Sequence, residues 1–317
     1  MGVTVVPTRS TTERTVRWLR PLAVANLVAN IAIVVTGGAV RVTGSGLGCP
    51  TWPRCTDESY VVRGELGVHG AIEFGNRMLT FVLVAIAVAC WVAALMAHRR
   101  VLARGGERRR PLVLATVIAL GIPAQAVLGG VTVLTDLNPW AVALHLLVSM
   151  AIIGVCVLLL DALRGPARPH APPMTRHLTV LTFVAAWVVL YLGTVVTGSG
   201  PHSGDTESRR TGLDPQVMSH VHAAAVYVLL ALTVALLVLS RRGGTPLLGR
   251  AAALLLAIEV AQGVVGFTQY YLDLPEGLVV LHLLGAALLS ASVTWVVVAA
   301  RQRSNGSSAT ATNNSAR

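Results

Sequence analysis

Two stretches of this 317-residue chain match each other without a gap: QAVLGGVTVLTDLNPWAVALHLL at 125–147 and QGVVGFTQYYLDLPEGLVVLHLL at 262–284. Each begins in an apolar run, turns at an Asp-Leu pair, and places a histidine early in the next apolar run, His145 and His282. Val-Thr-Gly-Ser-Gly also occurs twice, at 42–46 and 196–200. The repeats predict two related halves, 21–163 and 178–300.

The whole chain is strongly apolar. Hydrophobic residues make up 54% of it and charged residues 12%, which excludes a soluble globule, a disordered chain and a disulfide-dense miniprotein. Eight apolar runs each reach the roughly 20 residues that a helix needs to cross a bilayer, and in lipid only helices satisfy the backbone of such segments. The runs are 21–40, 69–97, 112–134, 140–163, 178–197, 218–239, 251–272 and 277–300. We therefore predict an all-α polytopic membrane protein with eight transmembrane helices in two pseudo-symmetric four-helix bundles. Matching helices lie four helices apart, so the halves share one orientation about an axis along the membrane normal.

The charges predict the orientation in the membrane. All 25 basic residues are arginine. The tails and the connections 98–111, 164–177 and 240–250 hold 19 arginines and two acids, whereas the connections 41–68, 135–139, 198–217 and 273–276 hold five arginines and nine acids. Arginine excess marks the cytoplasmic side, so both termini are expected there. The N-terminal tail, 1–20, shows no cleavable signal, and 301–317 reads as a disordered cytoplasmic tail. Arginines scattered over short loops argue against a nucleic-acid partner.

Five of the nine histidines lie near the outer ends of the even-numbered runs: His69, His145, His220, His222 and His282. Ionisable side chains in spans are rare and usually face a bundle interior. Paired imidazoles on facing helices are typical of bis-histidine haem ligation; zinc is disfavoured because thiolates are missing at this level, and a proton relay stays open. His220 and His222 point to different helix faces, so one of them at most faces a given site. The other four, His98, His170, His177 and His202, lie in loops and read as solvated residues.

The second run carries a polar face. His69, Glu73, Asn76 and Thr80 are spaced four, three and four residues apart, and Arg77 is one turn from Glu73. The Glu73–Arg77 pair is either a structural ion pair or a carboxylate for proton transfer, with Arg77 countering it or a haem propionate. Glu259, with Gln262 one turn on, is left between polar packing and a proton path.

Glycines and cysteines complete the set. Helix packing or close approach to a porphyrin explains Gly129, Gly130, Gly266 and Gly285 equally well. Cys49 and Cys55, six residues apart in an outer loop, are expected to form a disulfide that is structural or redox-active. Cys90 and Cys156 read as inert packing residues.

The stretch 36–53, TGGAVRVTGSGLGCPTWP, with IEFGNR at 72–77 and the two repeats, resembles the haem A synthase family of the bacterial type over 21–300. Arginine without lysine favours an actinobacterial member. The resemblance implies oxidation of the C8 methyl of haem O to a formyl group by successive hydroxylations, giving haem A for cytochrome oxidase in the cell membrane.

The resemblance also implies roles for single residues. His222 and His282 would be the axial ligands of a haem b that is structural or transfers electrons. Haem O would lie in the first half with His145 as axial ligand, Glu73 as the catalytic carboxylate, and Cys49 and Cys55 as the family's outer-loop pair.

One position departs from the family pattern, because Asn76 stands where a histidine is common. Asparagine is a poor iron ligand, so the substrate haem either has His145 as its one strong ligand or uses His69, which lies about 10 Å along the helix. Arg77 belongs to the same side of the site. No flavin or nicotinamide motif is present, so an external electron carrier is expected, with delivery of haem O by haem O synthase and a possible homo-oligomer. The alternatives are a dihaem electron-transfer cytochrome and a transporter.

Overall fold

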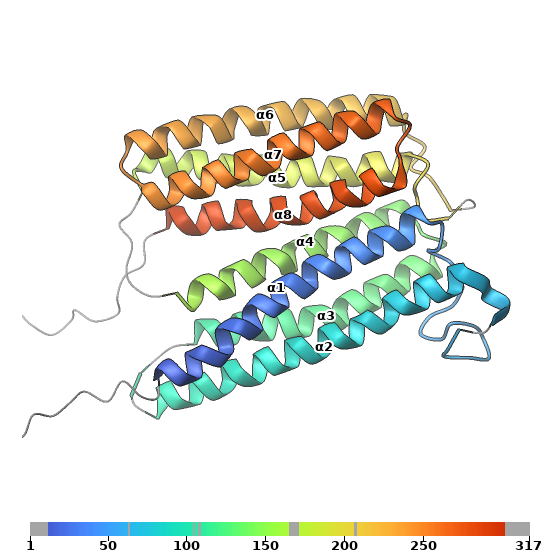
Figure 1. Cartoon of the computed structure of the whole chain (residues 1–317), viewed down its shortest axis with the longest axis horizontal. Coiled ribbons are helices and arrows are strands. Elements are labelled where there is room, and N and C mark those ends of the chain that lie inside the picture. The colour runs from blue at the N-terminus through green and yellow to red at the C-terminus, as the bar shows by residue number, and fades with distance from the viewer. Residues whose placement is uncertain are drawn as a thin grey trace, which may run out of the picture.

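The computed structural model describes residues 12–62, 64–103, 105–106, 109–164, 171–205 and 208–301. Eight long helices and one 3-10 turn make up the described chain (Figure 1). They are α1 (Thr12–Val42), η1 (Gly64–Leu66), α2 (Gly67–Leu102), α3 (Arg110–Leu134), α4 (Pro139–Ala162), α5 (Pro173–Ser199), α6 (Pro215–Arg242), α7 (Pro246–Tyr271) and α8 (Glu276–Ala300). All eight are long and apolar enough to cross a membrane, so the chain is a multi-pass membrane protein.

The helices match the eight predicted runs in order, and most of them extend beyond these runs at one or both ends. The extensions are polar or proline-led turns that an apolar run does not include. Proline is the first residue of α4, α5, α6 and α7, a position where its missing N–H costs nothing. Asn138 and Asp214 cap α4 and α6 by accepting backbone N–H bonds from Trp140 and Val217. The expected tail at 302–317, and His170, lie outside the described residues.

The helices form two rings of four, α1–α4 and α5–α8 (Figure 1). Within the first ring α1 and α3 each contact both α2 and α4, and within the second α5 and α7 each contact both α6 and α8. In the described chain, α2 does not contact α4, nor α6 α8. Each ring therefore holds its two even-numbered helices on a diagonal, on opposite sides of its axis.

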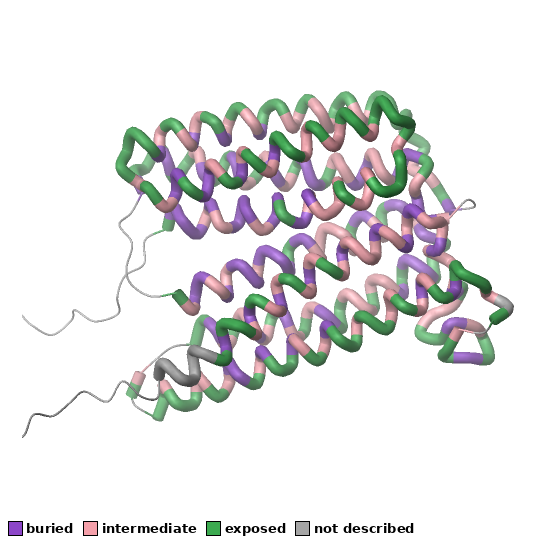
Figure 2. Tube along the Cα trace, in the orientation of Figure 1, coloured by how far each residue is buried: buried purple, intermediate pink, exposed green. Residues whose placement is uncertain are grey.

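The rings meet along α1, α4, α5 and α8. There α8 packs against α1 and α4, and α4 against α5. Ser290 of α8 donates to the Met150 carbonyl of α4 at 2.8 Å. Figure 2 shows the buried sections concentrated where helices face one another, and α8 is the most buried helix. The exposed faces carry many large apolar side chains, as expected of a lipid-facing surface.

The two Asp-Leu pairs of the repeats share an unusual backbone. Asp136 and Leu137 have φ of 52° and 55°, and Asp273 and Leu274 have φ of 56° and 60°. In both turns the leucine N–H bonds the carbonyl five residues earlier, at 2.8 Å. Two consecutive non-glycine residues in the left-handed region are rare, so the sequence repeat is also a repeat of backbone conformation.

The loops at the end of the molecule opposite the start of α1 and the end of α8 (Figure 1), here called the outer loops, are joined to one another. The N–H of Gly46 donates to the Gly204 carbonyl at 2.9 Å, and the side chain of Leu137 lies where a Cβ at either glycine would meet it. Arg41, at the end of α1, donates from Nε to the His202 carbonyl at 2.6 Å. The ring Nε2 of His202 lies 2.8 Å from the Leu274 carbonyl. All four outer connections thus belong to one contact network.

Candidate functional site

Three histidines on even-numbered helices lie against glycines of the preceding odd-numbered helix. A Cβ placed on Gly129 of α3 would be 3.4 Å from Cε1 of His145 in α4. The matching distance is 3.3 Å from Gly193 of α5 to His222 in α6, and 3.4 Å from Gly266 of α7 to His282 in α8. The imidazole of each histidine therefore packs against the bare backbone of a glycine instead of a neighbouring side chain.

His222 and His282 lie on the diagonal helices of the second ring. Neither Nδ1 atom has a partner that meets hydrogen-bond geometry in the described chain, although the Val189 carbonyl lies near the ring of His222. A buried polar atom without a partner is costly. These Nδ1 atoms lie on the side of the glycine helix, 3.8 and 3.9 Å from the Cβ positions of Gly193 and Gly266, so Nε2 is the ring nitrogen left to bind a ligand inside the ring of helices.

His145 occupies the corresponding place in the first ring. Its Nδ1 is also buried without a partner among the described residues. Gln125 of α3 donates from Nε2 to the His145 carbonyl at 3.0 Å and to the hydroxyl of Ser149. Ser149 in turn donates to the same carbonyl at 3.0 Å. The helical turn that carries His145 is therefore held in place from α3.

Asn76 lies diagonally across from α4, on α2. The hydroxyl of Thr36 in α1 donates to its Oδ1 at 2.8 Å, and its Nδ2 is 4.0 Å from the position of a Cβ on Gly37. The carboxamide is thus fixed by α1 through its oxygen, and Nδ2 has no hydrogen-bond partner among the described residues.

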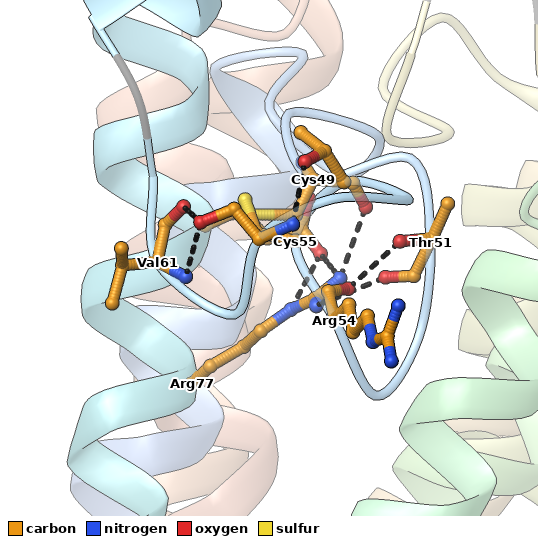
Figure 3. The surroundings of a disulfide bond; sticks show 9 residues. Cys49, Thr51, Arg54, Cys55, Val61 and Arg77 are labelled. Carbon is orange, nitrogen blue, oxygen red and sulfur yellow. Dashed lines mark hydrogen bonds and ion pairs between the residues drawn. A yellow bond between two sulfur atoms is a disulfide. The ribbon is translucent and has the colours of Figure 1, made fainter.

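A second set of contacts ties α2 to the outer loop between α1 and α2. Glu73 is 5% exposed; its Oε2 accepts the backbone N–H of Cys49 at 2.6 Å, and its Oε1 accepts Nε and Nη2 of Arg77 at 3.1 and 2.5 Å. Arg77 also donates to the carbonyls of Cys49, Thr51 and Arg54 at 3.0, 3.0 and 3.1 Å. Figure 3 shows the guanidinium of Arg77 directed into this loop. The Glu73–Arg77 pair therefore has a clear structural task.

The same loop is closed by a disulfide between Cys49 and Cys55 (Figure 3), as the sequence predicted. Both cysteines are fully buried. Between them, Trp52 reaches α3, where its indole occupies the place of a Cβ on Gly130. Gly130 is the neighbour of Gly129, so the loop packs beside the glycine that faces His145.

Comparison with known proteins identifies a family for this chain. A model of the family described as cytochrome oxidase assembly protein (COX15-CtaA) matches residues 20–69 and 67–202, more than half of the chain. The chain belongs to this family.

Several relatives of this chain are named "Heme A synthase". The protein of that name from Sinorhizobium medicae (strain WSM419) is 26% identical over 333 aligned residues, 88% of each chain. The one from Geobacillus kaustophilus (strain HTA426) is 31% identical over 140 residues, 43% of this chain and 40% of the relative. The one from Geobacillus thermodenitrificans is 30% identical over 146 residues, 45% and 42%. The first alignment covers most of this chain, and the other two each cover less than half of it.

The imidazoles of three other histidines considered in the sequence analysis, His69, His202 and His220, do not lie against a glycine of the described chain as those of His145, His222 and His282 do. His69 is exposed at the start of α2, with its Nδ1 2.9 Å from the hydroxyl of Ser45, and is not brought together with His145. His220 is exposed, 6.3 Å from the ring of Tyr270, whereas His222 is turned toward α5. His202 is no free loop residue, because its ring is bonded to Leu274.

Polar residues deeper in the helices have separate partners. Glu259, 3% exposed, accepts from Thr233 of α6 at 2.8 Å through Oε1, while its Oε2 is buried without a partner among the described residues. Cys90 and Cys156 are free and buried, and Asn30 lies 3.9 Å from the Cys156 sulfur. Gly285 lies against the side chain of Gln262 and not against a histidine.

Sequence reasoning missed Thr36, Trp52 and Arg41. Thr36 and Trp52 both lie inside the quoted stretch 36–53, but only a contact with a distant helix shows their role. Adjacent glycines at 129 and 130 were the one local signal that something larger than a methyl group needs room on α3.

Proposed function

We propose that the protein is a haem A synthase, which converts haem O into haem A by oxidising the C8 methyl group to a formyl group through successive hydroxylations. The observation that carries this proposal is the family match over 20–202, which contains the Glu73 carboxylate, the disulfide loop and His145. The alignment with haem A synthases over 88% of the chain supports it.

In the proposed orientation both termini are cytoplasmic. The start of α1 and the end of α8 lie at one end of the molecule (Figure 1), and the arginine-rich connections lie at that end. The loops with the Cys49–Cys55 pair and the two Asp-Leu turns then face outward. We further propose that 21–163 and 178–300 are pseudo-symmetric halves, which the shared left-handed turns support, and that the chain resides in the cell membrane.

The second half, 178–300, is proposed to hold haem b between His222 and His282. The fit rests on two imidazoles from diagonal helices, each with its Cε1 and Nδ1 against a glycine, so that Nε2 is the nitrogen available to the iron. A haem held this way supplies one-electron transfer when bound. The exposed position of His220 supports His222 as the proposed ligand on α6.

The first half, 21–163, is proposed to bind the substrate haem O, with His145 as its one strong axial ligand. Asn76 comes from the opposite diagonal helix, and the exposure of His69 at the start of α2, beside Ser45, supports a site that does not use it. Arg77, beside Glu73, is the cation on this side of the site.

Glu73 is the proposed catalytic residue. Each oxidation of the methyl carbon releases protons as well as electrons, and a buried carboxylate can accept a proton from the reacting carbon or from water. Its bonds to Arg77 and to the N–H of Cys49 position it at the same time. The loop contacts of Arg77 support a structural role for the disulfide, which keeps this loop closed over α2.

Electrons must leave the substrate, so an external electron carrier is a required partner. Haem O synthase, as the source of the substrate, and a homo-oligomeric state complete the proposed set.

The test is to express the chain in membranes together with a haem O source and to extract the pigments. Haem A is expected with the wild-type chain. Glu73→Gln should accumulate haem O with little haem A, whereas Glu276→Gln, an acid at the outer start of α8, should behave as wild type. Absence of haem A with the wild-type chain, despite bound haem O and an electron donor, contradicts the proposal.

The haem sites are tested in the same membranes. His282→Ala should remove the haem b spectrum and leave haem O bound, and His145→Ala should do the reverse. His220→Ala is the matched control and should change neither. Loss of both haems in each single variant with the fold intact contradicts the assignment to separate halves.

A further inference from the structure

The glycine–imidazole contact recurs in three of the four odd–even helix pairs, and the fourth pair shows the same arrangement with a different side chain. Gly129, Gly193 and Gly266 each face an imidazole on the next helix. In the pair α1–α2, Gly37 faces Nδ2 of Asn76. Asn76 thus occupies the place in the first ring that a histidine occupies in the other three pairs.

The chemistry of a carboxamide differs from that of an imidazole in a way that matters for this place. The side chains that hold haem iron in proteins are His, Cys, Met and Tyr, whereas a carboxamide offers two N–H donors. Thr36 engages Oδ1 at 2.8 Å, so the oxygen is occupied and the two N–H groups on Nδ2 are left as the available functional groups. The contact of the Thr36 hydroxyl with its own helix, 3.2 Å to the Ile33 carbonyl, is longer.

The two rings therefore differ in kind. The second ring has an imidazole on each diagonal helix, His222 and His282. The first has one imidazole, His145, and on the opposite diagonal helix a hydrogen-bond donor fixed from α1. Hydrogen-bond donors and steric access on the open side of a haem decide whether small ligands bind there.

We infer that the first ring contains a binding site for a small diatomic molecule or small anion, between the Nδ2 of Asn76 and the face of the bound haem that is opposite His145. The inference rests on the proposed haem sites. Asn76 is the donor that holds the ligand, and Thr36 is a positioning residue that keeps the carboxamide oxygen turned away. The second ring, closed by two imidazoles, has no such site.

The experiment uses the full-length protein purified with both haems, with carbon monoxide as the probe of the reduced form and cyanide as the probe of the oxidised form. One of the two haems is expected to bind each probe. Asn76→His should abolish binding of both probes and convert that haem to a low-spin spectrum, because a second imidazole takes the open face.

Two further variants distinguish the effect of the Asn76 N–H donors from the effect of leaving the haem face open. Asn76→Leu keeps the face open and removes the N–H groups, so it should still bind carbon monoxide, with a higher C–O stretching frequency, and should bind cyanide about tenfold more weakly. Thr36→Val should weaken cyanide binding by about threefold, since the carboxamide is no longer fixed. Thr194→Val is the matched control, because its hydroxyl bonds only its own helix at the Tyr191 carbonyl; it should bind cyanide as wild type does.

Four results would overturn the inference. If both haems are present and neither binds a probe, the first ring is closed and the inference fails while the proposed function stands. If Asn76→His binds the probes as the wild type does, or if Asn76→Leu leaves the cyanide affinity and the C–O stretch unchanged, Asn76 is not at the site. A purified protein that takes up no haem overturns the proposed function and this inference together.

Discussion

At the scale of single residues, Arg77 has the largest share in holding the disulfide loop. Its guanidinium bonds one carboxylate and three backbone carbonyls of the loop, a task that suits its planar, five-donor geometry. These carbonyls belong to Cys49, Thr51 and Arg54, so the contact covers most of the closed segment. The charge of Arg77 is balanced by Glu73, which keeps the cost of burying the pair low.

Arg77→Lys is therefore expected to loosen the loop. A lysine ammonium cannot reach Glu73 and three carbonyls together, and the lost bonds should cost about 2 kcal/mol of stability. The measurements are Tm in detergent and the rate of Cys49–Cys55 reduction by dithiothreitol, which should fall and rise respectively. Arg54→Lys is the control, since that side chain is exposed and, among the described residues, contacts only the Asp57 carbonyl and the ring of Tyr60 within the loop. Equal reduction rates in the two variants would contradict the role given to Arg77.

A methyl group at position 130 is expected to disturb the loop from the other side. Gly130→Ala places its Cβ inside the indole of Trp52, so Trp52 must move, at a cost of about 1–3 kcal/mol. The lower Tm should come with a change in tryptophan fluorescence. Gly75→Ala is the matched control: nothing lies within 4 Å of its Cβ, and alanine is the better helix former by about 1 kcal/mol. A Gly130→Ala variant as stable as the Gly75→Ala variant would show that Trp52 does not pack there.

At the scale of elements, the helices follow from the sequence far better than the loops do. Lengths of apolar residues fix eight helices, and proline and cap residues fix most of their starts. The matched stretches point to His145 and His282 as candidates for the site, and Asn76 is noticed only as a departure from the family pattern; their roles stay predictions. Contacts such as Thr36–Asn76 and Trp52–Gly130 join residues far apart in the chain, and no local periodicity encodes which distant helix a side chain meets.

The connection between α1 and the α5–α6 loop gives a prediction about elements. Arg41 holds the carbonyl of His202, and Gly46 bonds Gly204 in the same loop. Arg41→Met should free this loop, so hydrogen exchange of the Gly46 amide is expected to rise about tenfold. Arg210→Met is the control, because Arg210 bonds only Ser208 and Pro201 of its own loop, and should leave Gly46 unchanged. Unchanged exchange in Arg41→Met would show that the two loops do not depend on this guanidinium.

At the scale of the whole molecule, the arrangement is two rings that share one interface and one contact network at the outer end. The interface is dominated by α8, whose small and apolar residues lie between the rings. Charge asymmetry between the two ends predicts the direction of the molecule in the membrane. Sequence alone predicted this direction, and it remains a prediction.

Reporter fusions measure that direction. A fluorescent protein fused after Arg301 should fluoresce, because it folds in the cytoplasm, and alkaline phosphatase inserted after Asp205 should be active, because it lies outside. Exchanging the two reporters should silence both. Activity of alkaline phosphatase at the C-terminal fusion would reverse the orientation and place the disulfide loop in the cytoplasm.

At Leu137 an unfavourable backbone conformation is accepted because the side chain packs against distant loops. A leucine with φ of 55° costs about 1–2 kcal/mol relative to an ordinary backbone, and glycine would relieve that cost. Glycine would also leave unfilled the space between Gly46 and Gly204 that the leucine side chain occupies, a loss of about 2–5 kcal/mol for a buried leucine. The free energies therefore favour leucine at this left-handed position. Its side chain fills the space where three connections from both rings of helices meet, and a glycine in the turn would leave that space empty.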